Sequence, residues 1–234
     1  MKIFKFLSIY FKSITHRKIS FSYGGIDSIV EYIFKSKKNG LYVDVGCGHP
    51  IKNNNTYLLN KNGWTGVNID LDFSNIELFN IYRPKDLNIC EALSDNEKVV
   101  DLFFYHNKSS INTIEKRTSD YQNAKVSSIR KIKTKTLNSI LDNSQFKNMI
   151  IDFLTVDVEG SELSVLKNFN FDKYKPKVIV VEYLDLTLPK LEIKNIILSN
   201  ILNSEIYSLL IKKDYSLVNI LHADLVFVRN DFKD

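Results

Sequence analysis

The feature that most restricts the fold of this chain is a series of short apolar runs that alternate with segments of helical pattern. The apolar runs cover residues 41–45, 66–69, 87–93, 149–158 and 177–183. Helical patterns lie between or after them, as at residues 56–63 and 161–168. Strands that alternate with helices at this spacing pair in parallel. The sequence therefore predicts an α/β fold, with a mostly parallel sheet flanked by helices on both faces.

Several segments depart from this alternation. Residues 99–105 have the pattern of a further strand, and the polar stretch 106–130 is long enough to close over a binding site. A helical pattern covers residues 190–202. The segment 205–230 predicts two strands joined by a turn near Lys213 and Asp214, and therefore a C-terminal antiparallel hairpin.

Composition limits the class of protein. With 234 residues and 44% hydrophobic content, the chain can form the core of one α/β domain. Cys47 and Cys90 are too few and too far apart for a disulfide framework or a zinc site, so we expect a reducing, cytoplasmic compartment. The net charge of +5 is mild, and a basic stretch such as 129–135 is typical of a solvated face.

Residues 1–36 are predicted to form a helical extension of a domain that covers residues 37–234. Within residues 1–18, lysines lie opposite apolar residues that recur at helical spacing, namely Ile3, Phe4, Leu7, Tyr10, Phe11 and Ile14. Lys5 and Lys12 interrupt the apolar run, so we expect neither a signal peptide nor a membrane span. We expect this amphipathic helix to dock on the domain, and contact with a membrane surface, a partner or a second copy is the alternative.

Glycines and acids follow the first two strands, where ligands bind in open α/β sheets. Residues 44–48 read DVGCG, a glycine turn that lets a ligand approach the main chain. The third glycine of a dinucleotide fingerprint is missing, since His49 and Pro50 come next. Asp70 ends the second strand, where a carboxylate can accept hydrogen bonds from both hydroxyls of a ribose. Together these residues predict a nucleoside cofactor with an amino-acid moiety.

Three carboxylates, Asp157, Glu159 and Glu162, lie within six residues after the fourth main run. Such a cluster is costly without a cation, a basic partner or a shared proton, although Glu162 also suits the first turn of the following helix. Glu182 ends the next strand and lies beside Asp157 if the two strands are neighbours. Asp157, Glu182 and Asp185 then form a candidate site for Mg²⁺ or Mn²⁺, or one carboxylate acts as a general base.

The sequence resembles the FkbM-type S-adenosylmethionine-dependent methyltransferases. The resemblance spans residues 40–185 and rests on VDVGCGHPIKNNNTYLLNKNGWTGVNID, RPKDLNICEALSD and DFLTVDVEGSELSVLKN. It implies a Rossmann-like class I methyltransferase fold, S-adenosylmethionine as the cofactor, and methyl transfer to hydroxyl groups of sugars, polyketides and related small molecules.

The resemblance also implies roles for individual residues. It places Gly46 and Gly48 at the methionine part of the cofactor, Asp70 at the ribose, and residues 91–93 at the adenine. Asp157 and Glu159 fall at the methyl-transfer end. The candidate cofactor-binding residues are Asp44, Gly46, Cys47, Gly48, Asp70, Leu71, Glu91, Ala92, Leu93 and Asp157.

Methyl transfer to oxygen requires aligned reactants and removal of the hydroxyl proton. A carboxylate or a histidine can remove the hydroxyl proton, or a metal ion can lower the pKa of the hydroxyl. The candidate catalytic residues are Asp157, Glu159, Glu182 and His49, with His106 and His222 as further candidate bases. The predicted acceptor is a sugar, a nucleotide sugar or another glycan-related small molecule, as in polysaccharide biosynthesis. Candidates for binding its diphosphate are Lys108, Lys116 and Arg117.

Other classes of protein fit less well. The sequence has neither the Pro-Pro pair common in adenine methyltransferases nor a Pro-Cys nucleophile for cytosine C5 chemistry, so nucleic acid is not an expected partner. A dehydrogenase is disfavoured by the missing third glycine. A non-catalytic scaffold that keeps the fold, and an N-methyltransferase acting on a small metabolite, are the alternatives.

Overall fold

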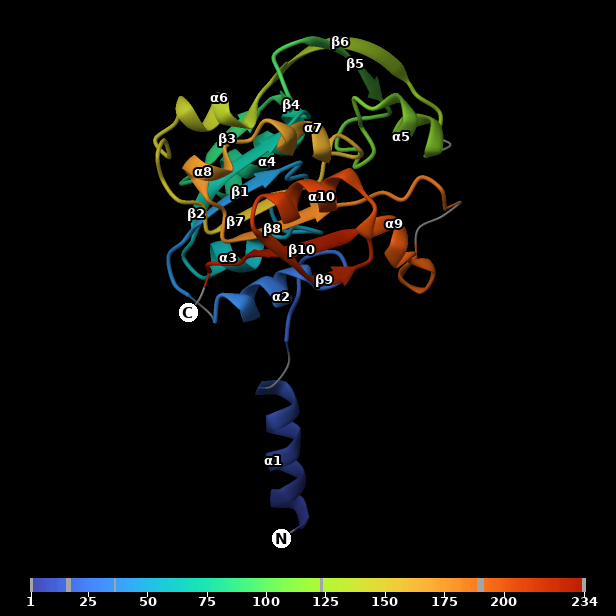
Figure 1. The fold of residues 1–234 in the computed structure, drawn as a ribbon. Coiled ribbons are helices and arrows are strands. Elements are labelled where there is room, and N and C mark those ends of the chain that lie inside the picture. Colours follow the sequence, from blue (N-terminus) through green and yellow to red (C-terminus); the bar gives the residue numbers. More distant parts are fainter. Residues whose placement is uncertain (1, 16–17, 36, 123, 189–191, 233–234) are drawn as a thin grey trace.

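The computed structural model describes residues 2–15, 18–35, 37–122, 124–188 and 192–232. Its centre is a seven-stranded sheet with the order β3-β2-β1-β7-β8-β10-β9 (Figure 1). The strands are β1 Leu41–Val45, β2 Thr65–Asp70, β3 Leu87–Cys90, β7 Phe153–Val156, β8 Val178–Glu182, β9 Tyr215–Leu221 and β10 Asp224–Arg229. Neighbours from β3 to β8 pair in parallel, whereas β10 pairs antiparallel with β8 and β9. The predicted mostly parallel sheet with a C-terminal antiparallel hairpin is confirmed.

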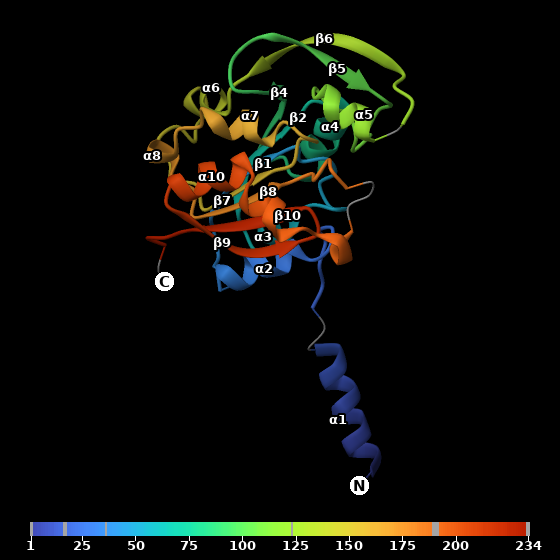
Figure 2. The same ribbon diagram turned by 45° about the vertical axis from the view of Figure 1, so that its right-hand side comes forward.

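A second, smaller sheet contains β4 Ala92–Leu93, β6 Ser128–Lys135 and β5 Val99–Phe104, in that order. Figures 1 and 2 show β5 and β6 arching above the large sheet. The predicted run 87–93 is therefore divided between two sheets, on either side of Glu91. β5 forms where the sequence predicts a strand, but β6 was not expected. Most side chains of β6 are exposed, so its sequence has no clear apolar signal.

Helices cover both faces of the large sheet, as the sequence predicts. α2 Ile26–Ile33 and α3 Tyr57–Lys61 pack against one face. The core on the other face includes residues of α6 Leu137–Asp142, α7 Glu162–Lys167, α8 Phe171–Tyr174, α9 Leu198–Leu202 and α10 Glu205–Lys212. β1 contributes to both cores, because Tyr42 points to one face and Leu41 and Val43 to the other.

The C-terminal hairpin begins later than predicted. Residues 205–212 form helix α10 rather than a strand, because the Ser204 side chain caps the helix and Ile206 and Leu210, one turn apart, both enter the core. The hairpin turn lies at residues 222–223, between β9 and β10, so the predicted turn near Lys213 and Asp214 is wrong. In place of the single helix predicted over residues 190–202, the structure has the 3₁₀ turn η1 Ile193–Asn195 followed by α9. Residues 190–191 lie outside the described residues.

Two further helices border the candidate site. α4 Phe73–Tyr82 follows β2 and packs beside β2 and β3. α5 Lys116–Tyr121 lies within the polar stretch 106–130, on the side of the molecule where β5 and β6 arch over the sheet (Figure 2). The polar stretch is therefore partly ordered into a helix and the beginning of β6.

Helix α1 Lys2–Thr15 forms as predicted, but it extends away from the body of the protein (Figures 1 and 2). Its apolar side chains are exposed, from 41% for Leu7 to 78% for Phe4, so the expected docking on the domain is wrong. The side chain of Ile14 lies outside the described part of the structure. α2 also falls within residues 1–36, yet it packs into the core, and the domain boundary at residue 36 stays a prediction. Among the described residues, no helix has the length and apolar character needed to cross a membrane.

Candidate active site

A cavity of about 670 Å³ opens at the carboxyl ends of β1, β2, β7 and β8. This is the edge of an α/β sheet at which ligands bind. The candidate cofactor residues that line it are Gly46, Cys47, Gly48, Asp70, Leu71, Glu91, Ala92, Leu93 and Asp157. The candidate catalytic residues Glu159, Glu182 and His49 line the same cavity. The fold therefore brings together residues from five separate parts of the sequence.

The two glycines of the turn after β1 serve different needs. Gly46 has φ +80°, and a Cβ atom there would overlap the main-chain carbonyl of Asp157, with the carbonyl carbon only 2.7 Å away. Gly46 thus permits the loops after β1 and β7 to pack against each other. Gly48 has φ +56°, and a Cβ atom there would meet nothing within 4 Å. Gly48 therefore leaves its main chain open to a ligand in the cavity.

Asp44 does not line the cavity. Its buried carboxylate accepts hydrogen bonds from Thr56 Oγ1 at 2.7 Å and Asn54 Nδ2 at 3.1 Å. Burial raises the pKa of Asp44 to about 6, and the hydrogen bonds and nearby Arg83 oppose that rise. Asp44 is thus placed to hold the loop that follows the glycine turn, rather than to contact a ligand directly.

Arg83 is a buried member of this network that the sequence analysis did not identify. It donates to Thr56 Oγ1 and Asn54 Oδ1, both at 2.8 Å, and also to the carbonyl oxygen of Pro50. A buried guanidinium is stable only when it is paired and hydrogen-bonded. Arg83 therefore ties the loop after β1 to the end of α4 and supplies the positive charge near Asp44.

Asp70 is held in place at the edge of the cavity. Its carboxylate accepts hydrogen bonds from the main-chain N–H of Gly48 at 2.9 Å, from that of Asp72 at 2.7 Å, and from Asn75 Nδ2 at 3.1 Å. Burial raises its pKa to about 6, and these donors partly offset the shift. A carboxylate fixed in this way is ionised at neutral pH and can still accept hydrogen bonds on its remaining lone pairs.

The residues after β3 form another wall of the cavity. The N–H of Glu91 donates to the carbonyl oxygen of Asp70 at 3.0 Å, which joins this wall to β2. The Glu91 carboxylate pairs with Lys135 at 2.6 Å. Ala92 and Leu93 are buried side chains that give the wall an apolar surface, and Cys47 is buried against Ile76 and Phe79. An apolar wall of this kind can pack against a planar aromatic ring of a ligand.

Carboxylates gather at the ends of β7 and β8. Oxygen atoms of Asp157, Glu159 and Glu182 lie within 4.8 Å of one another. Desolvation and the neighbouring acids raise the pKa of Glu182, and desolvation raises that of Asp157, which a hydrogen bond with Glu182 opposes. We call Asp157, Glu159 and Glu182 the acidic triad.

Glu159 has an unusual environment within the acidic triad. Its φ is +56°, a conformation that costs a non-glycine residue free energy. Its carboxylate accepts from Gln122 Nε2 at 3.0 Å, and its main-chain carbonyl accepts from Thr113 Oγ1 at 2.8 Å. Desolvation and the charges of Asp157 and Glu162 raise the pKa of Glu159 to about 9. In the absence of a cation, this pKa favours the protonated form of Glu159 at neutral pH.

Two predicted acids lie outside the acidic triad. Glu162 accepts from the N–H groups of Val158 and Gly160, at 2.9 and 3.0 Å, which fixes the turn before α7. Asp185 accepts from Thr187 Oγ1 at 2.6 Å and from Asn200 Nδ2 at 2.8 Å, and it lines a separate small cavity. The structure thus brings Asp157 and Glu182 together as predicted, with Glu159 rather than Asp185 as the third carboxylate.

The candidate histidines differ in position. His49 lines the cavity, and its Nδ1 accepts from the N–H groups of Ile51 and Lys52, both at 3.1 Å, so Nε2 carries the proton of the neutral ring. Desolvation and nearby Lys108 and Lys52 lower the pKa of His49. His222 also lines the cavity, from the β9–β10 turn, whereas His106 is exposed and is not among its lining residues.

Part of the polar stretch, between residues 108 and 114, lines one side of the cavity, and its closure over an acceptor stays a prediction. The N–H of Lys108 donates to Asp72 Oδ2, while Oδ1 of the same carboxylate accepts from the N–H of Ser74 and caps α4. A Cβ on Gly160 would overlap Thr118 of α5, so this helix lies directly against the turn after β7. Lys108 lines the cavity, whereas Lys116 is exposed and pairs with Asp120 at 2.8 Å. Arg117 is not among the lining residues.

Sequence analysis missed several residues of the cavity. Asp224 lies opposite Glu182 in the register of β10 and β8, and burial raises its pKa to about 7. The sequence analysis did not identify Asp224 as a site residue, because it predicted the hairpin turn near Lys213 and Asp214 rather than at residues 222–223. Tyr23 and Asn75 also line the cavity, although neither lies directly at the end of a strand. Their positions depend on how α2 and α4 pack.

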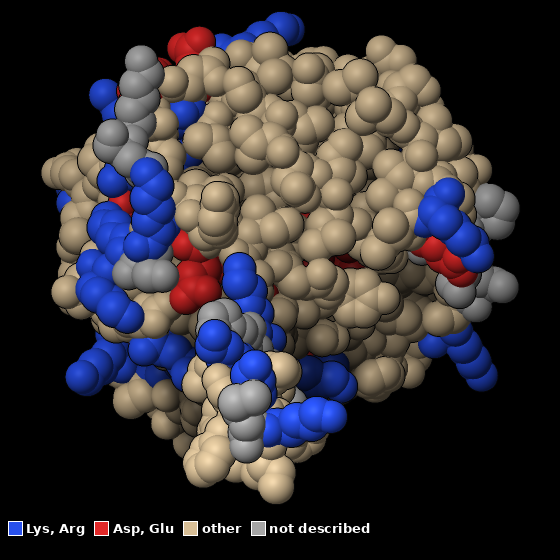
Figure 3. Space-filling view, turned by 90° about the horizontal axis from the view of Figure 1, so that it is seen from below, with Lys and Arg blue, Asp and Glu red and all other residues tan. Residues whose placement is uncertain are grey.

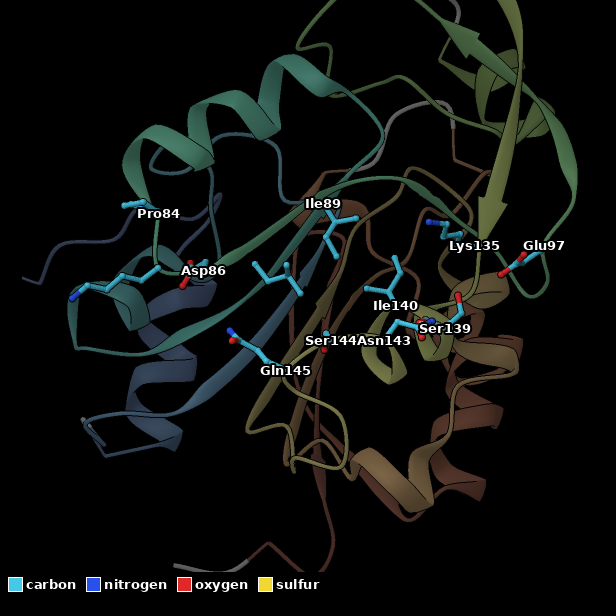
Figure 4. Close-up of a pocket in the computed structure, with 12 residues that line it drawn as sticks. Pro84, Asp86, Ile89, Glu97, Lys135, Ser139, Ile140, Asn143, Ser144 and Gln145 are labelled. Atoms are coloured by element: carbon cyan, nitrogen blue, oxygen red, sulfur yellow. The ribbon is translucent and has the colours of Figure 1, made fainter.

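A second cavity, of about 590 Å³, lies beside β3 and α6. Figure 4 shows Ile89 and Ile140 within it, with polar side chains such as Asn143 and Gln145 around them. Its lining contains no glycine turn and no cluster of carboxylates. The chemistry-bearing residues therefore converge on the first cavity.

A profile of the methyltransferase FkbM domain matches residues 44–217. The matched range begins at β1 and includes the glycine turn, Asp70 and the acidic triad. This chain belongs to the FkbM methyltransferase domain family. The α/β sheet with flanking helices is the architecture that the resemblance implied. Among curated proteins, no sequence matches this one.

Two solved structures are similar to this member of the FkbM family. Methyltransferase FkbM from Methylobacillus flagellatus KT aligns with a TM-score of 0.48 and 16% identity, over 82% of this chain and 44% of its own. This chain therefore spans less than half the length of that protein. A TehB-like SAM-dependent methyltransferase from Corynebacterium glutamicum ATCC 13032 aligns over 96% of both chains, with a TM-score of 0.42 and 10% identity.

Proposed function

We propose that this chain is an S-adenosylmethionine-dependent O-methyltransferase that acts on a hydroxyl of a sugar, a nucleotide sugar or another glycan-related small molecule. Membership of the FkbM family supports methyl transfer. The observation that carries the proposal is that one cavity joins the open glycine turn and Asp70 to the acidic triad. The glycine turn and Asp70 suit a nucleoside with an amino-acid part. The acidic triad suits removal of a proton from an acceptor.

The cofactor would be held by residues that line the cavity and can still contact a ligand. Asp70 would accept hydrogen bonds from the ribose hydroxyls, and the open main chain at Gly48 would border the methionine part. Ala92 and Leu93 would pack against the adenine. When bound, S-adenosylmethionine supplies a methyl group already activated by a positively charged sulfur. Asp44 and Arg83 would act indirectly, by fixing the loop after the glycine turn.

Asp157 and Glu182 would receive the hydroxyl proton of the acceptor. They share a hydrogen bond, and a shared site favours one proton and one negative charge for the pair. Without a bound cation, the raised pKa of Glu159 favours its protonated form, so it would donate a hydrogen bond rather than accept a proton. His49 is a weaker candidate, because its unprotonated nitrogen already accepts two main-chain hydrogen bonds.

The acidic triad also fits a divalent cation. Three carboxylate oxygens lie close enough to share one ion, and Glu182 Oε2 is enclosed without a hydrogen-bond partner among the described residues. Ionised carboxylates suit Mg²⁺ or Mn²⁺, and a bound cation would favour the ionised form of all three side chains. A cation held there would lower the pKa of an acceptor hydroxyl. Asp185, with both carboxylate oxygens engaged elsewhere, would not be a ligand.

Polar and basic residues that line the cavity support the proposed class of acceptor. Lys108 and Lys52 are the lining residues suited to a diphosphate, which gives nucleotide sugars a physical reason to bind. Ser109, Ser110 and Asn112 supply further hydrogen-bonding groups for sugar hydroxyls. These residues all come from the loops that border the cavity, where specificity commonly resides.

The proposal is tested by incubating the protein with S-adenosylmethionine that carries an isotopically labelled methyl group, and with a panel of nucleotide sugars and free sugars. Transfer to a sugar oxygen, seen as a labelled O-methyl signal by NMR, is the expected result. A labelled N-methyl product would instead identify an N-methyltransferase. Cofactor binding without transfer to any acceptor, in the presence of Mg²⁺ or Mn²⁺, would favour a non-catalytic scaffold.

A further inference from the structure

Helix α1 presents a wide apolar face to solvent. Ile3, Leu7 and Tyr10 recur at intervals of four and three residues, with exposed fractions of 73%, 41% and 53%. Phe6 lies on one side of this row, and the exposed Phe4 and Phe11 lie on the other. These six residues form the apolar face of α1. Such a surface is unusual on a protein without a partner for it.

The width of this face distinguishes between partners. At the helical angle of 100° per residue, its six residues span roughly 160° of the helix circumference. A two-stranded coiled coil uses a narrow seam of two positions in every seven, flanked by complementary charges. A bilayer interface accepts a broad apolar face that contains aromatic residues. The geometry therefore favours a lipid surface over a second copy of this helix.

Charge around α1 points to an anionic surface. Lys5 and Lys12 lie seven residues apart on the polar side of the helix, opposite the apolar face. The first acidic residue of the sequence is Asp27, whereas the preceding residues include Lys2, Lys5, Lys12, Arg17 and Lys18. Figure 3 views the molecule from below, where α1 projects, and shows Lys and Arg side chains gathered beside the helix, with few Asp or Glu side chains among them.

We propose that α1 binds in the interface of an anionic lipid bilayer, with its apolar face in the lipid and its lysines near the headgroups. Its 14 residues span roughly 21 Å as a helix, too short for the hydrocarbon core of a bilayer, so it lies in the plane of the interface. Lysine stems reach toward the headgroups while their ammonium groups stay in water.

Anchoring at α1 would keep the active-site cavity near the membrane. Tyr23 lines the cavity and is eight residues beyond Thr15, the last residue of α1. Eight residues extend at most about 28 Å. Tyr23, and with it one wall of the cavity, would therefore stay within about 28 Å of the anchored end of α1, a distance at which a membrane-bound acceptor could be met.

The test is flotation of the full chain with vesicles of two compositions, phosphatidylcholine alone and phosphatidylcholine mixed with phosphatidylglycerol. We expect binding to the anionic vesicles and much weaker binding to the neutral ones. Leu7→Ser should weaken binding roughly tenfold or more, because one buried apolar side chain is lost. Lys5→Gln should weaken it about fivefold, and only on anionic vesicles.

Ile81→Ser is the matched control. Ile81 is 77% exposed, much like the residues of α1, but it lies on α4. This variant should bind vesicles as the unchanged protein does. Equal binding by Leu7→Ser and the unchanged protein would overturn the proposal, as would no binding to anionic vesicles.

Light scattering on the same samples tests the competing partner. If the protein is a dimer without lipid, and Leu7→Ser makes it monomeric without affecting flotation, the apolar face pairs with a second copy and the proposal fails. Binding of S-adenosylhomocysteine, measured in parallel, checks that each variant keeps its fold. Because flotation requires no methyl transfer, its outcome is independent of the proposed enzymatic activity.

Discussion

A Cβ atom on Gly46 would overlap the main-chain carbonyl of Asp157, so the turn after β1 and the end of β7 are in direct backbone contact. We expect Gly46→Ala to lower the free energy of unfolding by about 3–5 kcal/mol, from the overlap and from the strain of φ +80°. Urea unfolding measures the effect. It should be accompanied by weaker cofactor binding, because the glycine turn would move.

Gly25→Ala is the control for this substitution. Gly25 also has a positive φ, +104°, but a Cβ there would meet nothing within 4 Å. The strain alone should cost about 1–2 kcal/mol. Equal losses at Gly46 and Gly25 would show that close packing against Asp157 is not what requires glycine.

Asp157→Asn should separate chemistry from binding. The substitution keeps the size of the side chain but removes its capacity to take a proton, so we expect kcat to fall about 100-fold or more. The affinity for S-adenosylhomocysteine should change little, since Asp70 and the main chain at Gly48 are untouched. Asp185→Asn, outside the acidic triad, should keep turnover. Full turnover in Asp157→Asn would remove Asp157 from the mechanism.

The cation hypothesis predicts dependence on a divalent metal. Exhaustive chelation should abolish methyl transfer, and added Mg²⁺ or Mn²⁺ should restore it. Calorimetry with Mn²⁺ alone should show binding that Glu182→Gln weakens at least roughly tenfold, because one of three carboxylate ligands is neutralised. If turnover survives chelation, the acidic triad works by proton transfer without a metal.

The raised carboxylate pKa values predict how stability depends on pH. The folded pKa of Asp224 is about 7, above its ordinary value of 3.8, so the folded protein binds this proton more tightly than the unfolded chain does. The free energy of unfolding contributed by Asp224 therefore rises as pH falls through the window from about 7 to about 4.

Urea unfolding at pH 8 and pH 5 measures this dependence. Asp224→Asn should reduce the gain in stability at pH 5, whereas the same substitution at the exposed Asp172 should leave the gain unchanged. An identical gain in Asp224→Asn and the unchanged protein would contradict the assignment.

Sequence reasoning succeeded where a strand is buried on both faces and followed by chemistry-bearing residues. β1, β2, β7 and β8 are such strands: the glycine turn follows β1, Asp70 ends β2, and Asp157 follows β7. The carboxyl ends of parallel strands meet at one edge, so proximity in space follows from topology alone.

It failed where the outcome depended on tertiary packing. Residues 205–212 have an apolar pattern that suits a strand or a helix, and they form a helix because Ile206 and Leu210 pack together in the core and Ser204 caps the first turn. Asp224 was missed as a consequence, because its place opposite Glu182 depends on the true hairpin register. Arg83 was missed because burial of a charged residue in a polar network has no periodic signal.

The central claim is that this cavity binds S-adenosylmethionine, and calorimetric titration with S-adenosylhomocysteine tests it most directly. NAD serves as the comparison ligand, and Asp70→Ala as the variant. We expect micromolar binding of S-adenosylhomocysteine, a loss of roughly tenfold or more in the variant, and no binding of NAD. Absence of S-adenosylhomocysteine binding by the folded protein, or equal binding by Asp70→Ala, would contradict the account.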